Sequence, residues 1–89
     1  MLESIMGLRK KIDSIDENLV ILLKDRIDLC KSIGKIKKET GLAVKDLRRE
    51  DAVYVHIMAK ALEADLDPQK VEAIFKQIIA LSVSVQGAE

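Results

Sequence analysis

The sequence predicts an all-α fold, and two features of its composition favour this class over a sheet. Aromatic residues make up only 2% of the chain, although strands are enriched in aromatic and β-branched side chains. Four glycines and one proline are too few to supply the turns of a many-stranded protein. With 89 residues the chain has the length of one small domain, so we expect residues 1–89 to fold as a single unit.

A long first helix is predicted by apolar residues that recur at intervals of three and four, as in a heptad seam. The seam consists of Ile5, Leu8, Ile12, Ile15, Leu19, Leu22, Leu29, Ile33 and Ile36. Neither glycine nor proline interrupts it between Leu8 and Ile33, which predicts one helix over about residues 2–38, roughly 55 Å long. Such a helix exceeds the diameter of a globule of this size. Its seam requires a second helix of equal length, so we expect a helical homodimer.

Two shorter helices are predicted to follow. Gly41 breaks the apolar period and indicates a turn. Asp46 can cap a helix over about residues 47–62, whose buried face would carry Val53, Ile57 and Ala61. Asp67 and Pro68 fit the N-cap and first position of a third helix over about residues 68–86. We therefore expect three helices per chain, one long and two short.

The charge balance and the apolar pattern exclude several classes of partner. Fifteen basic residues balance fifteen acidic ones, whereas nucleic-acid modules carry a basic excess, so we expect no nucleic acid. The longest apolar run, residues 19–23, is far shorter than the roughly 20 residues that cross a bilayer, so we expect no membrane partner. The charges at Glu3 and Arg9 do not fit a secretory signal. A lone cysteine, Cys30, cannot form an internal disulfide, which favours the cytoplasm.

Neither a metal centre nor a covalent catalyst is indicated by the reactive side chains. The chain has one histidine, His56, and no pair of cysteines, so a metal site would need carboxylates alone, and we expect none. Cys30 lies beside the seam and is interpreted as buried packing. If the protein is a catalyst, we therefore expect it to stabilise a transition state by electrostatic interactions, without a covalent step.

An arginine interrupts the apolar seam of the first helix. Ile5, Ile12 and Leu19 are seven residues apart, and the next position in that series is Arg26. A buried guanidinium costs several kcal/mol unless its charge is paired. Arg26 therefore either pairs with a protein carboxylate and sets the helix register, or binds the carboxylate of a ligand. Lys37 is eleven residues later and lies on nearly the same face of the helix, with its Cα atom about 16 Å from that of Arg26. It is either a second ligand-binding cation or a lysine exposed to solvent.

Other polar residues occupy positions where the core should continue. Asp46, Arg49 and Glu50 lie within one turn at the start of the second helix. They are either a helix N-cap with surface ion pairs or part of a ligand-binding site. Ser82 and Gln86 continue the apolar face of the third helix with polar side chains. Either the end of this helix frays, or the two residues belong to a ligand-binding site. Taken together, these residues favour one polar cavity for an anion.

Four motifs give the chain a resemblance to a known family. They are Leu8-Arg9-Lys10-Lys11-Ile12-Asp13, Gly34-Lys35-Ile36-Lys37, Val44-Lys45-Asp46-Leu47-Arg48-Arg49-Glu50 and Ser82-Val83-Ser84-Val85-Gln86, with Asp16, Glu17 and Arg26 between the first two. The ordered set, spread over nearly the whole chain, resembles the all-helical (AroQ-class) chorismate mutases. The resemblance implies an intertwined homodimer with two active sites. It also implies an isomerase that rearranges chorismate to prephenate, on the route to phenylalanine and tyrosine, without a cofactor.

The resemblance also implies a role for each matching residue. Lys37 and Gln86 would donate hydrogen bonds to the ether oxygen of the breaking C–O bond, and Arg26 would bind a substrate carboxylate. Glu50 and the backbone at Asp46 would hold the ring hydroxyl. The remaining substrate-binding residues would be Ser82 at a carboxylate, Arg49 at the edge of the site, and Arg9 donated across the subunit boundary.

The spacing of two arginines indicates, independently of the resemblance, that one site would need two chains. Arg9 and Arg26 are seventeen residues apart, roughly 25 Å along a helix, so one chain cannot apply both to one small molecule. Two alternatives remain open beside the mutase. One is an isochorismate-pyruvate lyase on the same fold. The other is a non-catalytic helical dimer in which Arg26 pairs with a protein carboxylate.

Overall fold

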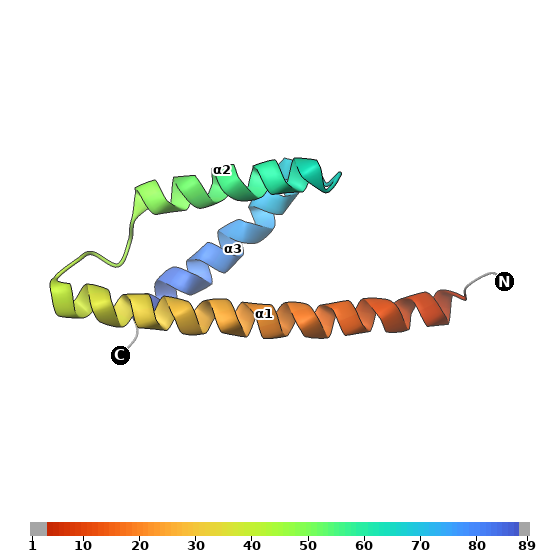
Figure 1. Ribbon diagram of the computed structural model, residues 1–89, viewed down its shortest axis with the longest axis horizontal. Helices are drawn as coiled ribbons and strands as arrows, with labels where there is room; N and C mark the ends of the chain where they lie inside the picture. Colours follow the sequence, from red (N-terminus) through yellow and green to blue (C-terminus); the bar gives the residue numbers. More distant parts are fainter. Residues whose placement is uncertain (1–3, 88–89) are drawn as a thin grey trace.

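The computed structural model describes residues 4–87 and confirms the all-α class, with three helices and no strand in that range. The helices are α1 (Ile5–Thr40), α2 (Leu47–Glu63) and α3 (Pro68–Gln86), one long and two short (Figure 1). The first helix was predicted from residue 2 to residue 38. Residues 2 and 3 lie outside the described residues, Ser4 is the N-cap, and the helix continues two residues further, to Thr40.

Local hydrogen bonds fix both ends of α1. The hydroxyl of Ser4 accepts from the backbone N–H of Gly7 at 3.0 Å. Gly41 adopts a left-handed conformation with φ of 73°, and the N–H groups of Gly41 and Leu42 both donate to the carbonyl of Lys37. Because a left-handed residue favours glycine, Gly41 ends the helix where the sequence predicts a turn.

The short helices begin at the predicted capping residues. The carboxylate of Asp46 accepts from the backbone N–H of Arg49 at 3.1 Å, and α2 continues to Glu63, one residue beyond the prediction. The carboxylate of Asp67 accepts from the N–H of Gln69 at 3.0 Å, and Pro68 is the first residue of α3. These caps satisfy N–H groups that have no partner inside the helix.

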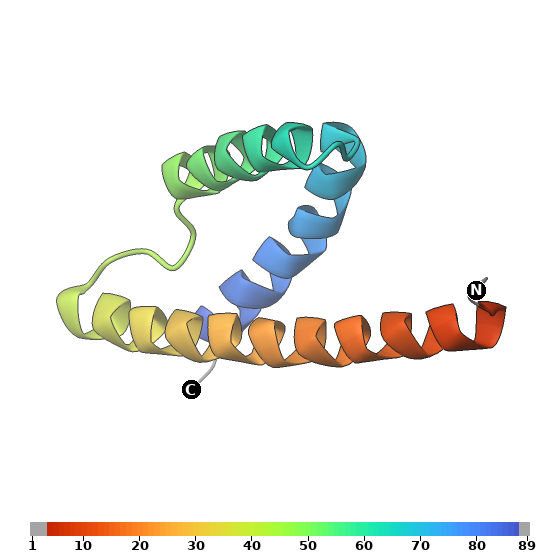
Figure 2. The same ribbon diagram turned by 45° about the vertical axis from the view of Figure 1, so that its right-hand side comes forward.

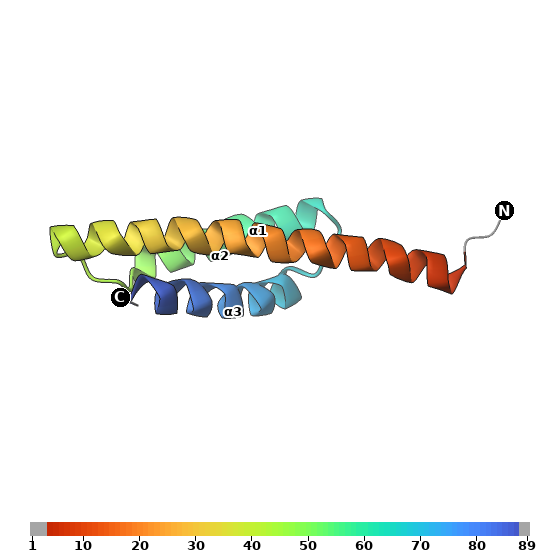
Figure 3. The ribbon, with the colours of Figure 1, turned by 90° about the horizontal axis from the view of Figure 1, so that it is seen from below.

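The third helix joins the other two. α3 packs against both α1 and α2, whereas α1 and α2 do not pack on one another. The N-terminal part of α1 projects beyond both short helices (Figure 2). α3 slants from the end of α2 to the C-terminal half of α1 (Figure 1), and the view from below shows that it does not extend along the N-terminal part of α1 (Figure 3). The radius of gyration is 16.6 Å, against about 12 Å for a compact chain of this length, so the molecule is elongated.

The single chain buries very little apolar surface. Among residues 4–87, the buried apolar residues are Ile27, Cys30, Ala61 and Ile79. Ile27 and Cys30 face α3 from a row of α1 beside the predicted seam, and the seam itself stays exposed, with Leu19 at 57%. Within the described residues no helix is both long enough and apolar enough to span a bilayer.

Candidate active site

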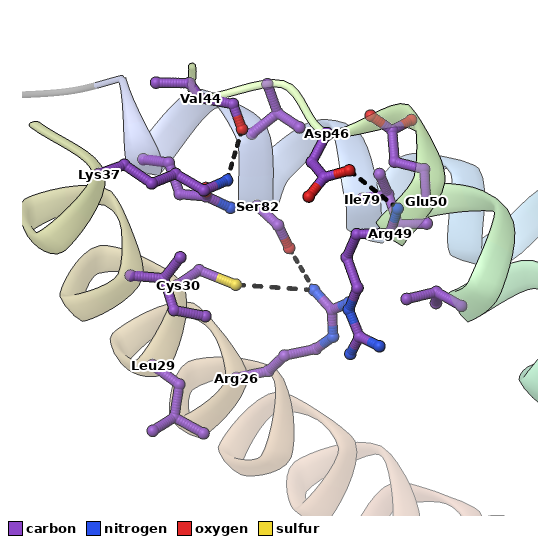
Figure 4. A pocket seen from close by; sticks show the side chains of 14 residues that line it. Arg26, Leu29, Cys30, Lys37, Val44, Asp46, Arg49, Glu50, Ile79 and Ser82 are labelled. Atoms are coloured by element: carbon purple, nitrogen blue, oxygen red, sulfur yellow. Dashed lines mark hydrogen bonds between the residues drawn. The ribbon is translucent and has the colours of Figure 1, made fainter. Parts of the chain in front are cut away.

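Seven of the eight predicted site residues line one pocket between the three helices (Figure 4). The pocket has a volume of about 410 Å³, within the usual range for small-molecule sites. Its remaining lining is mainly apolar. The predicted residues in it are Arg26 and Lys37 of α1, Asp46, Arg49 and Glu50 at the start of α2, and Ser82 and Gln86 of α3.

The guanidinium of Arg26 is held by uncharged groups. Its Nη1 donates to the hydroxyl of Ser82 and lies 3.9 Å from the sulfur of Cys30. No carboxylate within residues 4–87 forms an ion pair with it. Because a guanidinium has five N–H donors, most of them remain available to an anion in the pocket. Within one chain, residues 4–87 therefore provide no ion pair for Arg26, and a pair with a carboxylate of a second chain stays an alternative.

Ser82 is buried and its hydroxyl serves Arg26. The hydroxyl donates to the carbonyl of Ile78 at 2.8 Å and accepts from the Arg26 guanidinium. A hydroxyl carries a single proton, so none is left for a second acceptor. In this arrangement Ser82 orients the Arg26 guanidinium.

The ammonium of Lys37 connects the α1–α2 loop to α3. Its Nζ donates to the carbonyl of Val44 at 2.7 Å and to the side-chain oxygen of Gln86 at 2.7 Å. An ammonium has three N–H groups, so one remains for a ligand. Because the amide oxygen of Gln86 faces Lys37, its NH₂ end is a second donor.

Glu50 lines the pocket and carries an unsatisfied acceptor. Its Oε2 is buried and has no hydrogen-bond partner within the described residues, and the Lys45 ammonium lies 4.0 Å away. Buried carboxylate oxygens are normally hydrogen-bonded, since leaving one unpaired is costly. A ligand hydroxyl would supply the missing donor.

Asp46 and Arg49 form the outer edge of the pocket. The Asp46 carboxylate is engaged as the N-cap of α2, and both side chains are exposed. Arg49 points inward from α2 toward the same cavity as Arg26 (Figure 4). The cations around the pocket outnumber its carboxylates, which suits an anionic ligand.

The sequence matches the family model described as chorismate mutase type II over residues 8–87. The chain belongs to this family. As a chorismate mutase it is an enzyme of the isomerase class.

Individual relatives agree with the family assignment. The chorismate mutase of Methanocaldococcus jannaschii is 31% identical over 97% of this chain and 87% of its own length. A bifunctional chorismate mutase/prephenate dehydratase of Aquifex aeolicus is 33% identical over 96% of this chain, which spans only 24% of that protein. A solved structure, titled a conserved hypothetical protein from Pyrococcus furiosus, is 35% identical with a TM-score of 0.72. That match covers 94% of this chain and 99% of the other.

One predicted residue of this chorismate mutase lies apart from the others. Arg9 is exposed on the projecting part of α1 and does not line the pocket of its own chain. It is seventeen residues from Arg26 on one continuous helix, about 25 Å away. Its donation by a second subunit stays a prediction.

The sequence interpretation missed one residue that lines the mutase pocket, Cys30, and one that contacts a pocket residue from outside it, Gly34. Cys30 was interpreted as packing alone, and it is buried, but it also lines the pocket beside Arg26. Its spacing of four residues from Arg26 on a helix is the signal that could have found it. Gly34 was noted only within a motif, yet it touches the backbone of Gln86. No group of three or more His, Cys, Asp or Glu residues in the described range is arranged to hold a metal ion.

Proposed function

We propose that this enzyme rearranges chorismate to prephenate, on the route to phenylalanine and tyrosine, by electrostatic stabilisation without a covalent intermediate. The observation that carries the proposal is the pairing of two donor sets in one pocket. Arg26 has no ion-pair partner in residues 4–87. The Cα atom of Lys37 lies about 16 Å further along α1, and its ammonium is bonded to Gln86 of α3.

The first donor set would hold the substrate. Chorismate carries two carboxylates, and a guanidinium binds a carboxylate through two parallel hydrogen bonds. One carboxylate would bind Arg26, oriented by Ser82, and the other would bind Arg9 of the partner subunit. The unsatisfied Oε2 of Glu50, together with the backbone at Asp46, would accept and orient the ring hydroxyl. Arg49 would add positive charge at the edge.

The second donor set would act in the transition state. A pericyclic rearrangement needs no base and no nucleophile, but the ether oxygen gains negative charge as its bond to the ring stretches. The third N–H of Lys37 and the NH₂ group of Gln86 would donate to that oxygen. In a site closed to water, one such donor contributes about 3–4 kcal/mol of transition-state stabilisation. The enclosing residues would also hold the two reacting ends at near-contact distance.

An intertwined homodimer would complete each site. The exposed seam on α1 supports it, because a long amphipathic helix is marginal in water without a packing partner. Pairing two α1 helices in opposite directions would lay the projecting part of each chain over the pocket-bearing half of the other. Light scattering should then give twice the 9.9 kDa mass of one chain. The free thiol of Cys30 supports a reducing compartment such as the cytoplasm.

The direct test is to follow the loss of chorismate on adding the protein and to identify prephenate as the product. Isochorismate should be assayed in parallel, since release of pyruvate from it would assign the lyase activity instead. We expect chorismate to be consumed and prephenate to form in equal amount. A folded protein that leaves both substrates unchanged would refute the proposal.

A further inference from the structure

At Gly34 the backbones of α1 and α3 approach one another closely. A Cβ atom at this position would lie 2.6 Å from both the Cα and the carbonyl oxygen of Gln86. Carbon atoms in van der Waals contact are about 3.5–4.0 Å apart. Because both neighbouring atoms are backbone, no side-chain rotation could relieve the overlap. Gly34 has no positive φ, so the position requires the empty space and not an unusual conformation.

The residue approached in this way is the one that pairs with Lys37. Lys37 follows Gly34 by one helical turn and therefore lies on the same face of α1. Its Nζ donates to the side-chain oxygen of Gln86 at 2.7 Å. Gln86 is thus fixed to α1 twice, through its backbone at Gly34 and through its side chain at Lys37.

We propose that Gly34 is a positioning residue for the Lys37–Gln86 donor pair. The assignment rests on the proposed function, in which this pair stabilises the ether oxygen. By having no side chain, Gly34 sets the distance between α3 and α1 at the site. That distance determines whether the Gln86 amide reaches both Lys37 and the substrate.

The size of the effect follows from the overlap. An alanine at position 34 would push the end of α3 away by about 1 Å to restore normal contact. A 2.7 Å hydrogen bond lengthened by that amount passes beyond about 3.5 Å, where it is no longer effective. A misplacement of about 1 Å can cost up to about 10²-fold in rate. Arg26 hydrogen-bonds to Ser82, one turn before Gln86 on α3, and to Cys30 on its own helix. It is farther from the overlap than Lys37 is, so ground-state binding of the substrate carboxylate should change less than the transition-state interaction.

The experiment is a double-mutant cycle with chorismate as substrate, on Gly34→Ala, Gln86→Ala and the double variant. We expect Gly34→Ala to lower kcat about 10- to 100-fold while KM stays within about threefold, the pattern of a lost transition-state interaction. In the Gln86→Ala background the same change should cause no further loss, because a positioning residue acts only through its target. The matched control is Gly87→Ala, where a Cβ would meet only carbonyl oxygens of Ser84 and Val83 at 3.9 Å. It should keep wild-type kcat.

NMR and circular dichroism distinguish a local displacement of Gln86 from a general loss of structure. In ¹⁵N-labelled protein, the side-chain amide signals of Gln86 should shift in Gly34→Ala and stay unchanged in Gly87→Ala. Circular dichroism should show the same helicity in every variant, since alanine is a better helix former than glycine. Loss of helicity in Gly34→Ala would mean that the close approach maintains the fold, which would overturn the assignment.

The kinetic outcomes distinguish this inference from the proposed function. Wild-type kcat in Gly34→Ala, with Gln86→Ala impaired, would overturn the role of Gly34 and leave the proposed function standing. Independent, additive losses would also overturn it. Full activity in Gln86→Ala would remove the donor role of Gln86, and the role of Gly34 would fail with it.

Discussion

Lys37 and Gln86 are 49 residues apart in sequence and are joined by a 2.7 Å hydrogen bond from Nζ to Oε1. The bond turns the amide oxygen toward the cation, so the NH₂ end of Gln86 is the end available as a donor. A glutamine amide does not titrate, so it can donate at any ordinary pH.

Replacing Gln86 with glutamate should make the reaction depend on acid. A carboxyl group donates only while protonated, and its reference pKa is about 4.3. Burial and the charge of the substrate would raise that pKa, whereas the neighbouring Lys37 would lower it. Gln86→Glu should therefore be impaired at neutral pH and recover as the pH falls. The measurement is kcat/KM against pH for both proteins, with helicity followed by circular dichroism. Equal activity of the variant at pH values around 5 and 8, parallel to the wild type, would contradict the donor role.

Arg26→Met should abolish activity and preserve the fold. Methionine has a similar length and restores an apolar residue to the seam, while the loss of the guanidinium removes a half-buried charge. We expect turnover of chorismate to fall by at least about 10²-fold, because the clamp that orients the substrate is lost. Lys24→Met is the matched control, since it removes an exposed cation from the same helix. An unfolded Arg26→Met protein would instead support a structural role.

Mixing two inactive variants should restore activity if the sites are shared between chains. Arg9→Ala and Arg26→Ala homodimers should each be nearly inactive. A mixed dimer has one site with both defects and one site with neither, so co-refolding should return up to about half of the wild-type activity per mixed dimer. The formation of mixed dimers must be verified separately by mass. If they form without any activity, Arg9 does not cross to the partner's site.

Tyr54, the single tyrosine of the chain, should titrate late. Partial burial raises the pKa of the phenol above its ordinary value of 10.0, and the carboxylates of Glu50, Glu72 and Asp51 raise it further. The folded state therefore favours the neutral phenol. This contribution to stability is complete below pH 10 and is lost as the pH rises toward the folded pKa. Ultraviolet titration of the phenolate should give a midpoint above 10, lowered in Glu50→Gln and unchanged in the distant control Glu17→Gln.

The helices could be predicted from the sequence because their signals are local. Gly41, Asp46 and Asp67 mark ends through backbone hydrogen bonds within a few residues, and each is found where it was expected. The face that α1 uses could not be predicted in the same way. Apolar residues of α1 at intervals of three and four form more than one row along the helix. The row that packs on α3 carries Ile27 and Cys30, whereas the predicted seam lies beside it and is exposed.

Seven site residues were predicted from polar side chains at positions where the core should continue, and all seven line one pocket. The eighth, Arg9, was predicted only from the family resemblance and lies outside that pocket. The roles assigned to them, and the crossing of Arg9 between subunits, stay predictions. The contact of Gly34 with Gln86 could not be foreseen, since it depends on how closely two distant segments approach. A glycine inside a helix does not by itself reveal which segment comes near.

The pocket draws its walls from two helices that do not touch one another. α1 supplies Arg26 and Lys37, α2 supplies Arg49 and Glu50, and α3, which packs against both helices, sets the spacing between them. A ligand that binds both walls would therefore add a direct link between α1 and α2 that the empty chain lacks. Binding should then raise the melting temperature, and the increase should grow with the logarithm of the ligand concentration. It should also slow amide hydrogen exchange most in the first turn of α2.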